Sequence, residues 1–561
     1  MEKLLEKYPR AGKILKYGTA GFRDRAALPL DPTFVRMGMM AVARSRSCAN
    51  QAVGVMITAS HNPEPDNGLK LVDPDGGMLS QAWEPQCEAL TNADSAAEAL
   101  RLLQLLEEQS TEESAVEGQP TVYLARDTRP HSLALMGCVR AGVEAAGGVV
   151  RDLGEAATPL LHFAVASANG GGPAGAPAAD EQGNWSASLT HAHYYHTLAK
   201  GFADLMSTTG VSAAGSAPAF SVVLDASFGV GSLAVEAMVL QLAAMGAEGL
   251  LSVDLRNKAG DGPVNEGCGA ELVQKGLVPP CGVSAGADAG KTLVSFDGDA
   301  DRVVFHTFLG DSAEGDGWTL LDGDKIACLL AESLQTELQA AGMGAEHYSL
   351  GAVQTAYANG AASDYLRAAG VPVVMAKTGV KHVHHKALQF DCGVYFEANG
   401  HGTVLFSEKL VKGIGELEVE GDSRAHLAAH RLRALLLAIN SSVGDALSDA
   451  MVALACLAVR GWTLQDWIRS YTDYPSRQLK LAVQNKSLIT CSEDETTALS
   501  PPALPVALAA AAAKVKQGRC FVRPSGTEDV VRVYAEAADR EAADALAQEC
   551  IAAIKSALGE E

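Results

Sequence analysis

The segment SFDGDADRVVF carries three carboxylates at alternate positions, Asp297, Asp299 and Asp301, with a glycine after the first. A tight loop of this kind lets alternate side chains converge on one hard divalent cation. An EF-hand loop begins in the same way, but it requires glycine at its sixth position and glutamate at its twelfth. This chain has Arg302 and Phe308 there. The alternation therefore predicts a cation site, with an ordinary acidic turn between two strands as the alternative.

A second motif, RPSGTEDVVR, lies near the C-terminus and has the chemistry of an anion cradle. Arg523 and Arg532 offer forked, charged donors. Ser525 and Thr527 offer hydroxyls, and Gly526 lets backbone amides approach an oxyanion closely. Because S-G-T is also a common turn, phosphate binding and a plain turn both remain open, and the two flanking arginines favour phosphate.

The stretch CGVYFEANGHGTVLF interrupts a strand with Glu397, Asn399 and His401 around two glycines. A carboxylate, an amide and an imidazole together suit the hydroxyls and acetamido group of an amino sugar. A hairpin turn with incidental polar residues is the alternative.

A serine follows the apolar run AVGVMI, where a buried strand gives way to the polar loop TASHNPEPDNG. Ser60 is followed by His61, and Lys70 comes ten residues after the serine. Taken alone, such a serine is most often a helix cap. Near the N-terminus, YGTAGFRDR places Arg23 after two glycines, which suits a basic finger on a flexible loop.

The segment KTGVKHVHHK offers a second basic spot at Lys377 and Lys381. Its histidines, His382, His384 and His385, suggest a metal site, but no cysteine or carboxylate cluster accompanies them, so this interpretation is disfavoured. The strand end ARDTRP fits a helix cap and a site element equally well.

Composition limits the classes of function. Forty-four basic and 67 acidic residues give a formal net charge of −23, which disfavours nucleic acid and anionic membrane as partners. The longest aliphatic run, ALLLAI, is too short to span a bilayer, and the N-terminus does not resemble a signal peptide. Eleven scattered cysteines without a C-x-x-C pair indicate neither disulfides nor zinc. We expect a cytoplasmic protein with reduced thiols.

A chain of 561 residues should divide into roughly three to five domains. Three segments, beginning TVYLARDTRP, FSVVLDASFGVG and YSLGAVQTAYANG, each predict a strand, a loop, a helix and a parallel strand. The C-terminal part predicts a smaller α+β domain. Residues 168–184, dense in Gly, Ala and Pro, predict a mobile surface insertion. The expected domains are 1–185, 186–308, 309–445 and 446–561.

Taken together and in this order, TASHNPEPDNGLK, DGDADR, EANGHG and RPSGTEDVVRVY resemble the α-D-phosphohexomutase superfamily. The resemblance covers nearly the whole chain and is closest to the eukaryotic branch that acts on N-acetylglucosamine phosphates. ARDTRP comes after the serine loop, as in the permuted first domain of that branch. The resemblance implies a four-domain α/β architecture, in which three related α/β domains with mixed sheets precede a smaller C-terminal α+β domain.

The resemblance also implies an activity, the reversible conversion of N-acetylglucosamine 6-phosphate to the 1-phosphate in UDP-N-acetylglucosamine biosynthesis. Ser60 would be the phosphoserine and a sugar 1,6-bisphosphate the intermediate and activator. One Mg²⁺ would bind the Ser60 phosphoryl group with Asp297, Asp299 and Asp301. The alternatives are a phosphoglucomutase or phosphomannomutase of the same superfamily, and a non-catalytic sugar-phosphate-binding relative.

Site roles follow from the matching positions. The resemblance implies catalytic roles for Ser60, His61, Lys70, His401, Arg23 and Arg302, with the acid and base open between Lys70 and His401. It implies substrate binding by Glu397, Ala398, Asn399, Lys381, Arg523, Pro524, Ser525, Gly526, Thr527 and Arg532. The chain departs from its relatives at Phe228, commonly Asn, and in VNEGCGA. We expect a monomer or weak homodimer, with a hinge near 440–460 that opens the site.

Overall fold

The computed structural model describes residues 1–10, 12–18, 21–25, 28–109, 118–171, 185–211, 218–309, 317–417, 424–525 and 529–559. Most of the predicted insertion, residues 172–184, lies outside this set. The chain forms two compact units, each taken by itself below. Unit 1 comprises Met1–Asp322, Asn399–Thr403 and Leu417–Val459, and unit 2 comprises Gly323–Ala398, Val404–Glu416 and Arg460–Glu561. The four expected domain bounds divide the chain more finely than this and stay a prediction.

The first sheet of unit 1 is mixed, in the order β1-β3-β2-β4-β5. Its strands are β1 (Phe22–Arg25), β2 (Val53–Ile57), β3 (Asp66–Val72), β4 (Thr121–Arg126) and β5 (Val149–Glu155). β3 runs antiparallel to β1 and β2, whereas β2, β4 and β5 are parallel. Since β2 and β4 are parallel neighbours, the serine loop and ARDTRP leave the sheet at the same edge.

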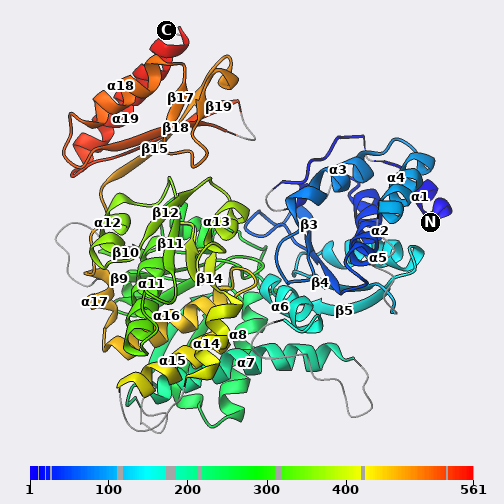
Figure 1. Ribbon diagram of the computed structural model, residues 1–561, viewed down its shortest axis with the longest axis horizontal. Helices are drawn as coiled ribbons and strands as arrows, with labels where there is room; N and C mark the ends of the chain where they lie inside the picture. The colour runs from blue at the N-terminus through cyan, green and yellow to red at the C-terminus, as the bar shows by residue number, and fades with distance from the viewer. Residues whose placement is uncertain are drawn as a thin grey trace. The chain divides into compact units, whose positions relative to one another are not determined.

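Helices cover this sheet (Figure 1). Those that contact its strands are α2 (Asp31–Ser47), α5 (Ser132–Ala145) and α6 (Thr158–Ala168), and those that pack on α2 are α1 (Glu2–Lys7), α3 (Glu84–Asn92) and α4 (Ala96–Gln109). All five residues of β2 are buried, because both α2 and α6 pack against this strand. A strand covered on both faces reads as a continuous apolar run, which explains VGVMI.

The second sheet of unit 1 has the order β10-β9-β8-β6-β7. Its strands are β6 (Phe220–Asp225), β7 (Leu251–Arg256), β8 (Thr292–Phe296), β9 (Val303–Phe308) and β10 (Trp318–Leu321). β6, β7 and β8 are parallel, and β9 and β10 are antiparallel to their neighbours. The three-carboxylate segment is thus the turn between β8 and β9.

The remaining helices of unit 1 are α7 (Ala187–Ser207), α8 (Gly231–Ala244), α9 (Ala270–Gly276), α10 (Ala285–Asp288), α15 (Arg424–Ala438) and α16 (Ala446–Arg460), the last residue of which falls in unit 2. α7 packs against both α8 and α15. α15 and α16 are the helical stretch expected near 424–458.

Unit 2 contains a four-stranded sheet in the order β12-β11-β13-β14. Its strands are β11 (Leu350–Thr355), β12 (Val373–Ala376), β13 (Cys392–Phe396) and β14 (Gly402–Phe406), the first two residues of which fall in unit 1. β11 is parallel to β12 and to β13. The helices are α11 (Gly323–Ala340), α12 (Gly360–Ala368), α13 (Val380–Ala387) and α14 (Glu408–Glu416). EANGHG joins β13 to β14.

The C-terminal part of unit 2 is built on the antiparallel sheet β15-β19-β18. Its elements are α17 (Leu464–Ile468), β15 (Ser476–Ala482), β16 (Thr490–Cys491), β17 (Ala498–Ser500), α18 (Ala503–Ala512), β18 (Arg519–Pro524), β19 (Val530–Glu536) and α19 (Arg540–Leu558). Both α18 and α19 contact this sheet (Figure 1). Val522, Val533 and Leu546 lie in its apolar core, so the segment is a smaller α+β domain.

Each of the three predicted strand-helix-strand segments forms a parallel unit, namely β4-α5-β5, β6-α8-β7 and β11-α12-β12. In the described part of the chain, none of the eleven cysteines forms a disulfide. In the part of the chain that the structure describes, no helix is both long enough and apolar enough to cross a membrane.

Candidate active site

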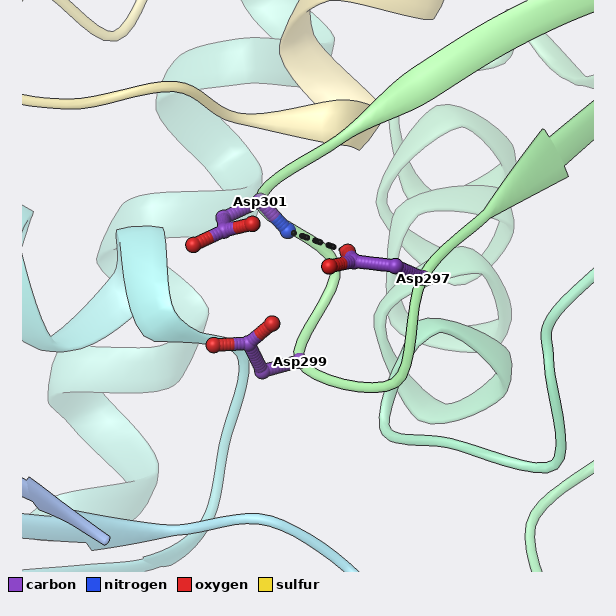
Figure 2. A group of neighbouring side chains, drawn as sticks. All are labelled: Asp297, Asp299 and Asp301. Carbon is purple, nitrogen blue, oxygen red and sulfur yellow. Dashed lines mark hydrogen bonds between the residues drawn. The ribbon is translucent and has the colours of Figure 1, made fainter. Parts of the chain in front are cut away.

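The turn between β8 and β9 gathers three buried carboxylates. One oxygen from each of Asp297, Asp299 and Asp301 lies within 4.8 Å of the other two, and the side chains point toward a common space (Figure 2). Asp297 Oδ1 accepts hydrogen bonds from the backbone amides of Asp301, at 3.1 Å, and Arg302, at 3.2 Å. These two bonds close the turn that brings alternate side chains together. We call residues 297–301 the carboxylate loop.

The glycine of this loop has a steric reason. A Cβ at Gly298 would lie 2.6 Å from Val264 Cγ1 and 3.0 Å from the carbonyl oxygen of Ser60. Any side chain here would push the serine loop and the carboxylate loop apart. The glycine of the D-G-D sequence is therefore needed for two reasons: the carboxylate loop bends there, and the serine loop packs against it.

Ser60 is buried and faces the carboxylate loop. Its Oγ donates a hydrogen bond to Asp297 Oδ2 at 2.9 Å, and its amide donates to Thr58 Oγ1 at 2.8 Å. Its φ of 50° lies in the left-handed region, which a non-glycine residue adopts only when its surroundings impose it. The hydroxyl is therefore fixed beside the carboxylates by the backbone.

Two residues without an assigned role impose this conformation. Arg129 Nη2 donates to the carbonyl oxygens of Ser60 at 3.0 Å and Asn62 at 2.5 Å. Asn265 Nδ2 donates to the same two oxygens, each at 2.8 Å. Arg129 is fully buried and also bonds the carboxylate of Asp127. The sequence pointed to Arg129 only through the possibility that ARDTRP is a site element. It gave no role to Asn265, because VNEGCGA stood out only as a segment that differs from its relatives.

Lys70 and His401 contact the carboxylate loop from two other segments. Lys70 Nζ donates to Asp299 Oδ2 at 3.2 Å and to Asp301 Oδ2 at 3.0 Å. Burial alone would lower the pKa of Lys70, but these two carboxylates outweigh it and raise the pKa. His401 Nδ1 lies 3.2 Å from Asp301 Oδ1. His401 Nε2 is buried and has no hydrogen-bond partner among the described residues.

Interactions of the EANGHG loop fix the backbone position of His401. Asn399 Oδ1 accepts a hydrogen bond from the His401 amide at 3.0 Å, so part of the Asn399 amide group shapes the loop. Gly400 has a φ of +83°, and a Cβ there would lie 2.0 Å from the carbonyl oxygen of Val303. Only glycine lets this loop approach β9 so closely.

Arg302 brings positive charge to the carboxylates. Its Nε lies 3.8 Å from Asp297 Oδ2 and 3.7 Å from Asp301 Oδ1, and its Nη1 donates to Glu271 Oε2 at 3.0 Å. The guanidinium thus lies between the carboxylate loop and α9, where Glu271 fixes its orientation.

Arg23 and His61 lie near the same positive charge. Arg23 Nη1 donates to Asn62 Oδ1 at 2.8 Å, and burial, followed by the charge of Arg302, lowers its pKa. Burial and then the charges of Arg302 and Arg23 hold the pKa of His61 far below its usual range. His61 is therefore neutral at physiological pH, which suits an orienting residue better than a proton donor.

The carboxylate loop fits a hard divalent cation. Asp299 Oδ1 and Asp301 Oδ1 are buried without a hydrogen-bond partner among the described residues. Burial, followed by the charges of Asp301 and Asp299, raises the pKa of Asp297 far above its usual range. Burial also opposes ionisation of Asp301, but Lys70 and His401 outweigh it and hold that pKa far below the usual range. Buried oxygens without partners and crowded negative charge are what Mg²⁺ or a similar ion neutralises.

Thr158, a further residue without a prior assignment, positions Asp299. Its Oγ1 donates to Asp299 Oδ2 at 2.7 Å, and its amide donates to the Asp299 carbonyl oxygen at 3.0 Å. The sequence offers no signal for this role, since the threonine simply opens α6. In the described part of the chain, the aspartate trio is the cluster that could hold a metal, and the α13 histidines belong to none.

In unit 2, the predicted anion motif begins at the end of β18. Arg523 Nε donates to the Tyr357 hydroxyl at 3.2 Å, and Nη1 donates to Glu495 Oε1 at 3.3 Å. Burial opposes its charge, but Tyr357 and Glu495 outweigh burial and raise the pKa of Arg523. Arg532 lies directly across from Arg523 on β19. The two arginines of the motif thus share one end of a hairpin.

The turn of this hairpin lies only partly within the described residues. Pro524 ends β18, and the buried Ser525 donates its amide to the carbonyl oxygen of Val530 at 2.9 Å. Gly526 and Thr527 lie outside the described residues. Their predicted contacts with phosphate stay a prediction.

The sugar-loop residues of unit 2 surround the start of α13. Glu397 Oε1 accepts a hydrogen bond from the Gly379 amide at 3.2 Å, and Lys381 is buried within α13. Glu495 Oε2 accepts from the Thr378 amide at 3.1 Å. Ala398 contributes its carbonyl oxygen to the Gly323 amide at 3.3 Å. Glu397, Lys381 and Glu495 are therefore gathered at one helix end.

Family models and curated relatives of this chain are sugar-phosphate mutases, in agreement with a site built from a buried serine and three carboxylates. The family model for phosphoacetylglucosamine mutase AMG1, domain III, matches residues 322–462. Models for phosphoglucomutase/phosphomannomutase match residues 39–98 (alpha/beta/alpha domain I) and 483–553 (C-terminal domain). Phosphoacetylglucosamine mutase of Arabidopsis thaliana is 41% identical over 98% of this chain and 96% of its own length. That of Homo sapiens is 42% identical over 97% and 94%.

Solved structures agree. N-acetylphosphoglucosamine mutase of Aspergillus fumigatus superimposes with a TM-score of 0.88 at 36% identity, covering 99% of this chain and 98% of that one. Its complex with GlcNAc-6P and magnesium has a TM-score of 0.87, with the same identity and coverage. The fold is thus that of the phosphohexomutases, a class of multi-domain α/β phosphomutases. Within that class, the chain belongs to the phosphoacetylglucosamine mutase family, which confirms the predicted family and fold class.

Proposed function

We propose that this chain interconverts N-acetylglucosamine 6-phosphate and N-acetylglucosamine 1-phosphate by phosphoryl transfer at Ser60. The observation that carries the proposal is the placement of a buried serine hydroxyl 2.9 Å from a carboxylate of the aspartate trio. A structural serine has no need of three buried carboxylates, two of which have an oxygen without a hydrogen-bond partner among the described residues. A phosphoryl carrier does, because its negative charge must be neutralised inside the protein.

The reaction has two steps of the same kind. The bond between phosphorus and Ser60 Oγ breaks while the phosphorus bonds to a free hydroxyl of the sugar phosphate, giving a 1,6-bisphosphate. The bisphosphate turns around, and its other phosphoryl group returns to Ser60 Oγ. In each step the attacking hydroxyl gives its proton to a base, and the leaving oxygen takes up a proton from an acid. Phosphoryl transfer of this kind depends chiefly on positioning and charge.

The residues that would hold Mg²⁺ are Asp297, Asp299 and Asp301, together with the phosphoryl group on Ser60. When bound, the ion neutralises the clustered negative charge and withdraws electrons from the phosphoryl oxygens. Arg302 and Arg23 add positive charge near the transferring group. Arg129 and Asn265 hold the serine loop through its carbonyl oxygens, so the reacting oxygen does not drift.

Lys70 and His401 are the candidates for the acid and base. Both contact the carboxylate loop, and His401 Nε2 has no partner among the described residues. A base acts within hydrogen-bond reach of the proton that it takes. Lys70→Met and His401→Gln distinguish the two, since loss of the acting group lowers kcat much more than it changes KM.

The residues of the anion motif and of the sugar loop would bind the part of the substrate that is not reacting. Arg523, Ser525 and Arg532 would hold the second phosphate, together with Pro524, Gly526 and Thr527. Glu397, Ala398, Asn399 and Lys381 would contact the sugar. The pairing of Arg523 with Tyr357 and Glu495 supports this assignment, because a guanidinium already held by two partners loses little freedom on binding phosphate.

Comparing initial rates on the 6-phosphates of N-acetylglucosamine, glucose and mannose tests the proposal. We expect the N-acetylglucosamine compound to give the highest kcat/KM and the Ser60→Ala variant to give none. A higher kcat/KM on glucose or mannose phosphate would assign the chain to that activity instead. A wild-type protein that binds sugar phosphate without turnover would be the non-catalytic relative. The cytoplasmic location, the monomeric or weakly dimeric state and the hinge stay proposals.

A further inference from the structure

The segment that links α15 to α16 contacts the active site, although no site motif includes it. We call residues 440–445 the support loop. A Cβ at Gly444 would lie 2.9 Å from the carbonyl oxygen of Asp301 and 3.1 Å from His401 Cε1. Just beyond the loop, the Ala446 amide donates to the carbonyl oxygen of Ala300 at 3.0 Å. Backbone of this segment therefore packs directly on the carboxylate loop and on the imidazole beside it.

The support loop also holds the segment that carries His401. Asn440 accepts a hydrogen bond at its carbonyl oxygen from Thr403 Oγ1 at 2.8 Å. The Asn440 side chain donates to the carbonyl oxygen of Pro159 at 3.2 Å, next to the threonine that bonds Asp299. One short loop thus touches the carboxylate loop, the segment that carries His401 and the start of α6, where Thr158 bonds Asp299.

A single buried carboxylate fixes the shape of the support loop. Asp445 Oδ2 accepts from the Tyr194 hydroxyl at 2.5 Å and from Asn440 Nδ2 at 3.0 Å. Asp445 Oδ1 accepts from the Ser448 amide at 3.0 Å. Asp445 is completely buried and its hydrogen bonds come from α7, from α16 and from the loop itself. Loss of this acceptor would leave buried donors unsatisfied and release the loop.

We propose that Asp445 is a positioning residue for phosphoryl transfer, because it holds Gly444 against Asp301 and His401 and so fixes the carboxylate and the imidazole relative to each other. The inference rests on the proposed function and deepens it. A glycine is required at 444, since a methyl group would displace either the Asp301 backbone or the His401 ring. Asp445 itself touches neither substrate nor reacting atoms.

Asp449 provides a matched control. It lies in the first turn of α16, four residues after Asp445, and is completely buried, and its Oδ1 has no hydrogen-bond partner among the described residues. Its Oδ2 accepts only a long bond, 3.4 Å, from the Asp445 amide. Burial and then the charge of Asp445 raise its pKa far above the usual range, so Asp449→Asn changes little in charge. Asp449→Asn and Asp445→Asn therefore differ mainly in what they do to the support loop.

The experiment measures three quantities for Asp445→Asn, Gly444→Ala and Asp449→Asn. These are the Mg²⁺ affinity by calorimetry without substrate, kcat and KM for N-acetylglucosamine 6-phosphate, and the melting temperature. We expect Asp445→Asn and Gly444→Ala to lower kcat by about tenfold or more with KM nearly unchanged, because geometry is lost at the reacting centre alone. Mg²⁺ affinity should fall in both, and Asp449→Asn should resemble the wild type.

Folded Asp445→Asn and Gly444→Ala variants with wild-type kcat and Mg²⁺ affinity would overturn the inference. An equal loss of kcat in Asp449→Asn would also overturn it, since loss of either buried carboxyl group at this end of α16 would then explain the effect. If Asp445→Asn does not fold, Gly444→Ala decides, because it leaves the hydrogen bonds of Asp445 in place. If the wild type has no mutase activity, the proposed function fails. The Mg²⁺ affinities of the variants would still show whether the support loop positions the carboxylates.

Discussion

The carboxylate loop of unit 1 and the anion hairpin of unit 2 hold charged groups in opposite ways. The carboxylates are buried close to one another, and two of their oxygens have no hydrogen-bond partner among the described residues. Arg523 is also largely buried, but Tyr357 and Glu495 compensate its charge. The first arrangement is unfavourable until a cation binds, whereas the second is stable by itself.

The backbone differs in the same sense. Five non-glycine residues in the loops around the carboxylates have φ between 50° and 64°: Ser60, Ser227, Phe228, Asn265 and Ala300. The anion hairpin instead continues two regular antiparallel strands. Left-handed backbone costs free energy and persists only where its surroundings impose it. Such residues therefore cluster around the carboxylates, whereas among the described residues of the anion hairpin and its partners Glu495 is the one in this region, with a φ of 60°.

Ser60→Ala should have the largest effect of any substitution in the carboxylate region. Without the Oγ, no phosphoryl group can be carried, and we expect activity to fall by at least about four orders of magnitude. Initial-rate assays and circular dichroism check the activity and the fold.

Ser45→Ala is the control for that variant. Ser45 is a buried serine of α2, and its Oγ donates to the carbonyl oxygen of Gln51 at 2.6 Å. Its loss should cost about 1 kcal/mol of stability and leave turnover unchanged. Near-normal turnover by Ser60→Ala would show that the phosphoryl carrier is elsewhere.

Asp297→Asn tests the unfavourable charge directly. Removing one of three crowded carboxylates should lower activity by about two to three orders of magnitude, since charge neutralisation by the metal is lost. It should change the stability of the metal-free protein by less than about 1 kcal/mol, because burial and the neighbouring carboxylates raise the pKa of Asp297 and already keep that carboxyl protonated. Thermal melts with and without Mg²⁺ measure both effects. A variant that Mg²⁺ still stabilises as strongly as the wild type would contradict the role of Asp297.

Arg523→Lys and Arg519→Lys form a matched pair on β18. Arg519 donates to both carboxylate oxygens of Glu536, at 2.6 and 3.0 Å, so its role is structural. We expect Arg523→Lys to raise KM by about tenfold with little change in kcat, since a lysine cannot reproduce the forked donor. Arg519→Lys should lower stability by about 2 kcal/mol and leave KM unchanged. The reverse pattern would exchange the two roles.

Phe228→Asn should have the smallest effect. Phe228 has a φ of 54°, and asparagine tolerates the left-handed region better than phenylalanine does. The phenyl ring also packs on Gly262, where a Cβ would lie 2.8 Å from its Cζ, so the gain is partly offset. We expect stability to rise by at most about 1 kcal/mol, and chemical denaturation measures it. A large loss would show that the ring contact outweighs the strain.

The pattern of apolar and polar residues was sufficient to predict the main strands and the loops that follow them. VGVMI, TVYLAR and SVVLD are apolar runs that end at polar loops, and parallel strands bring such ends to one edge of a sheet. The alternation in DGDADR likewise predicted three converging carboxylates. Local patterns of this kind depend only on neighbours along the chain.

The supporting residues depend on distant partners, and they escaped prediction except for Arg129, whose strand end left a helix cap and a site element open. Asn265 and Arg129 act on the backbone carbonyl oxygens of a loop that is 205 and 69 residues away, and such contacts leave no local pattern. Thr158 opens a helix like any threonine. Glu495, between β16 and β17, has no periodic signal at all. These residues became visible only once the fold placed them.

The most direct test is to map the phosphorylated residue after incubation with glucose 1,6-bisphosphate and Mg²⁺, by mass spectrometry of the intact protein and its peptides. The account predicts one phosphoryl group per chain, on Ser60, that is lost when N-acetylglucosamine 6-phosphate is added and appears in the sugar bisphosphate. A phosphoryl group on another residue, or turnover by a protein that never carries one, would contradict it.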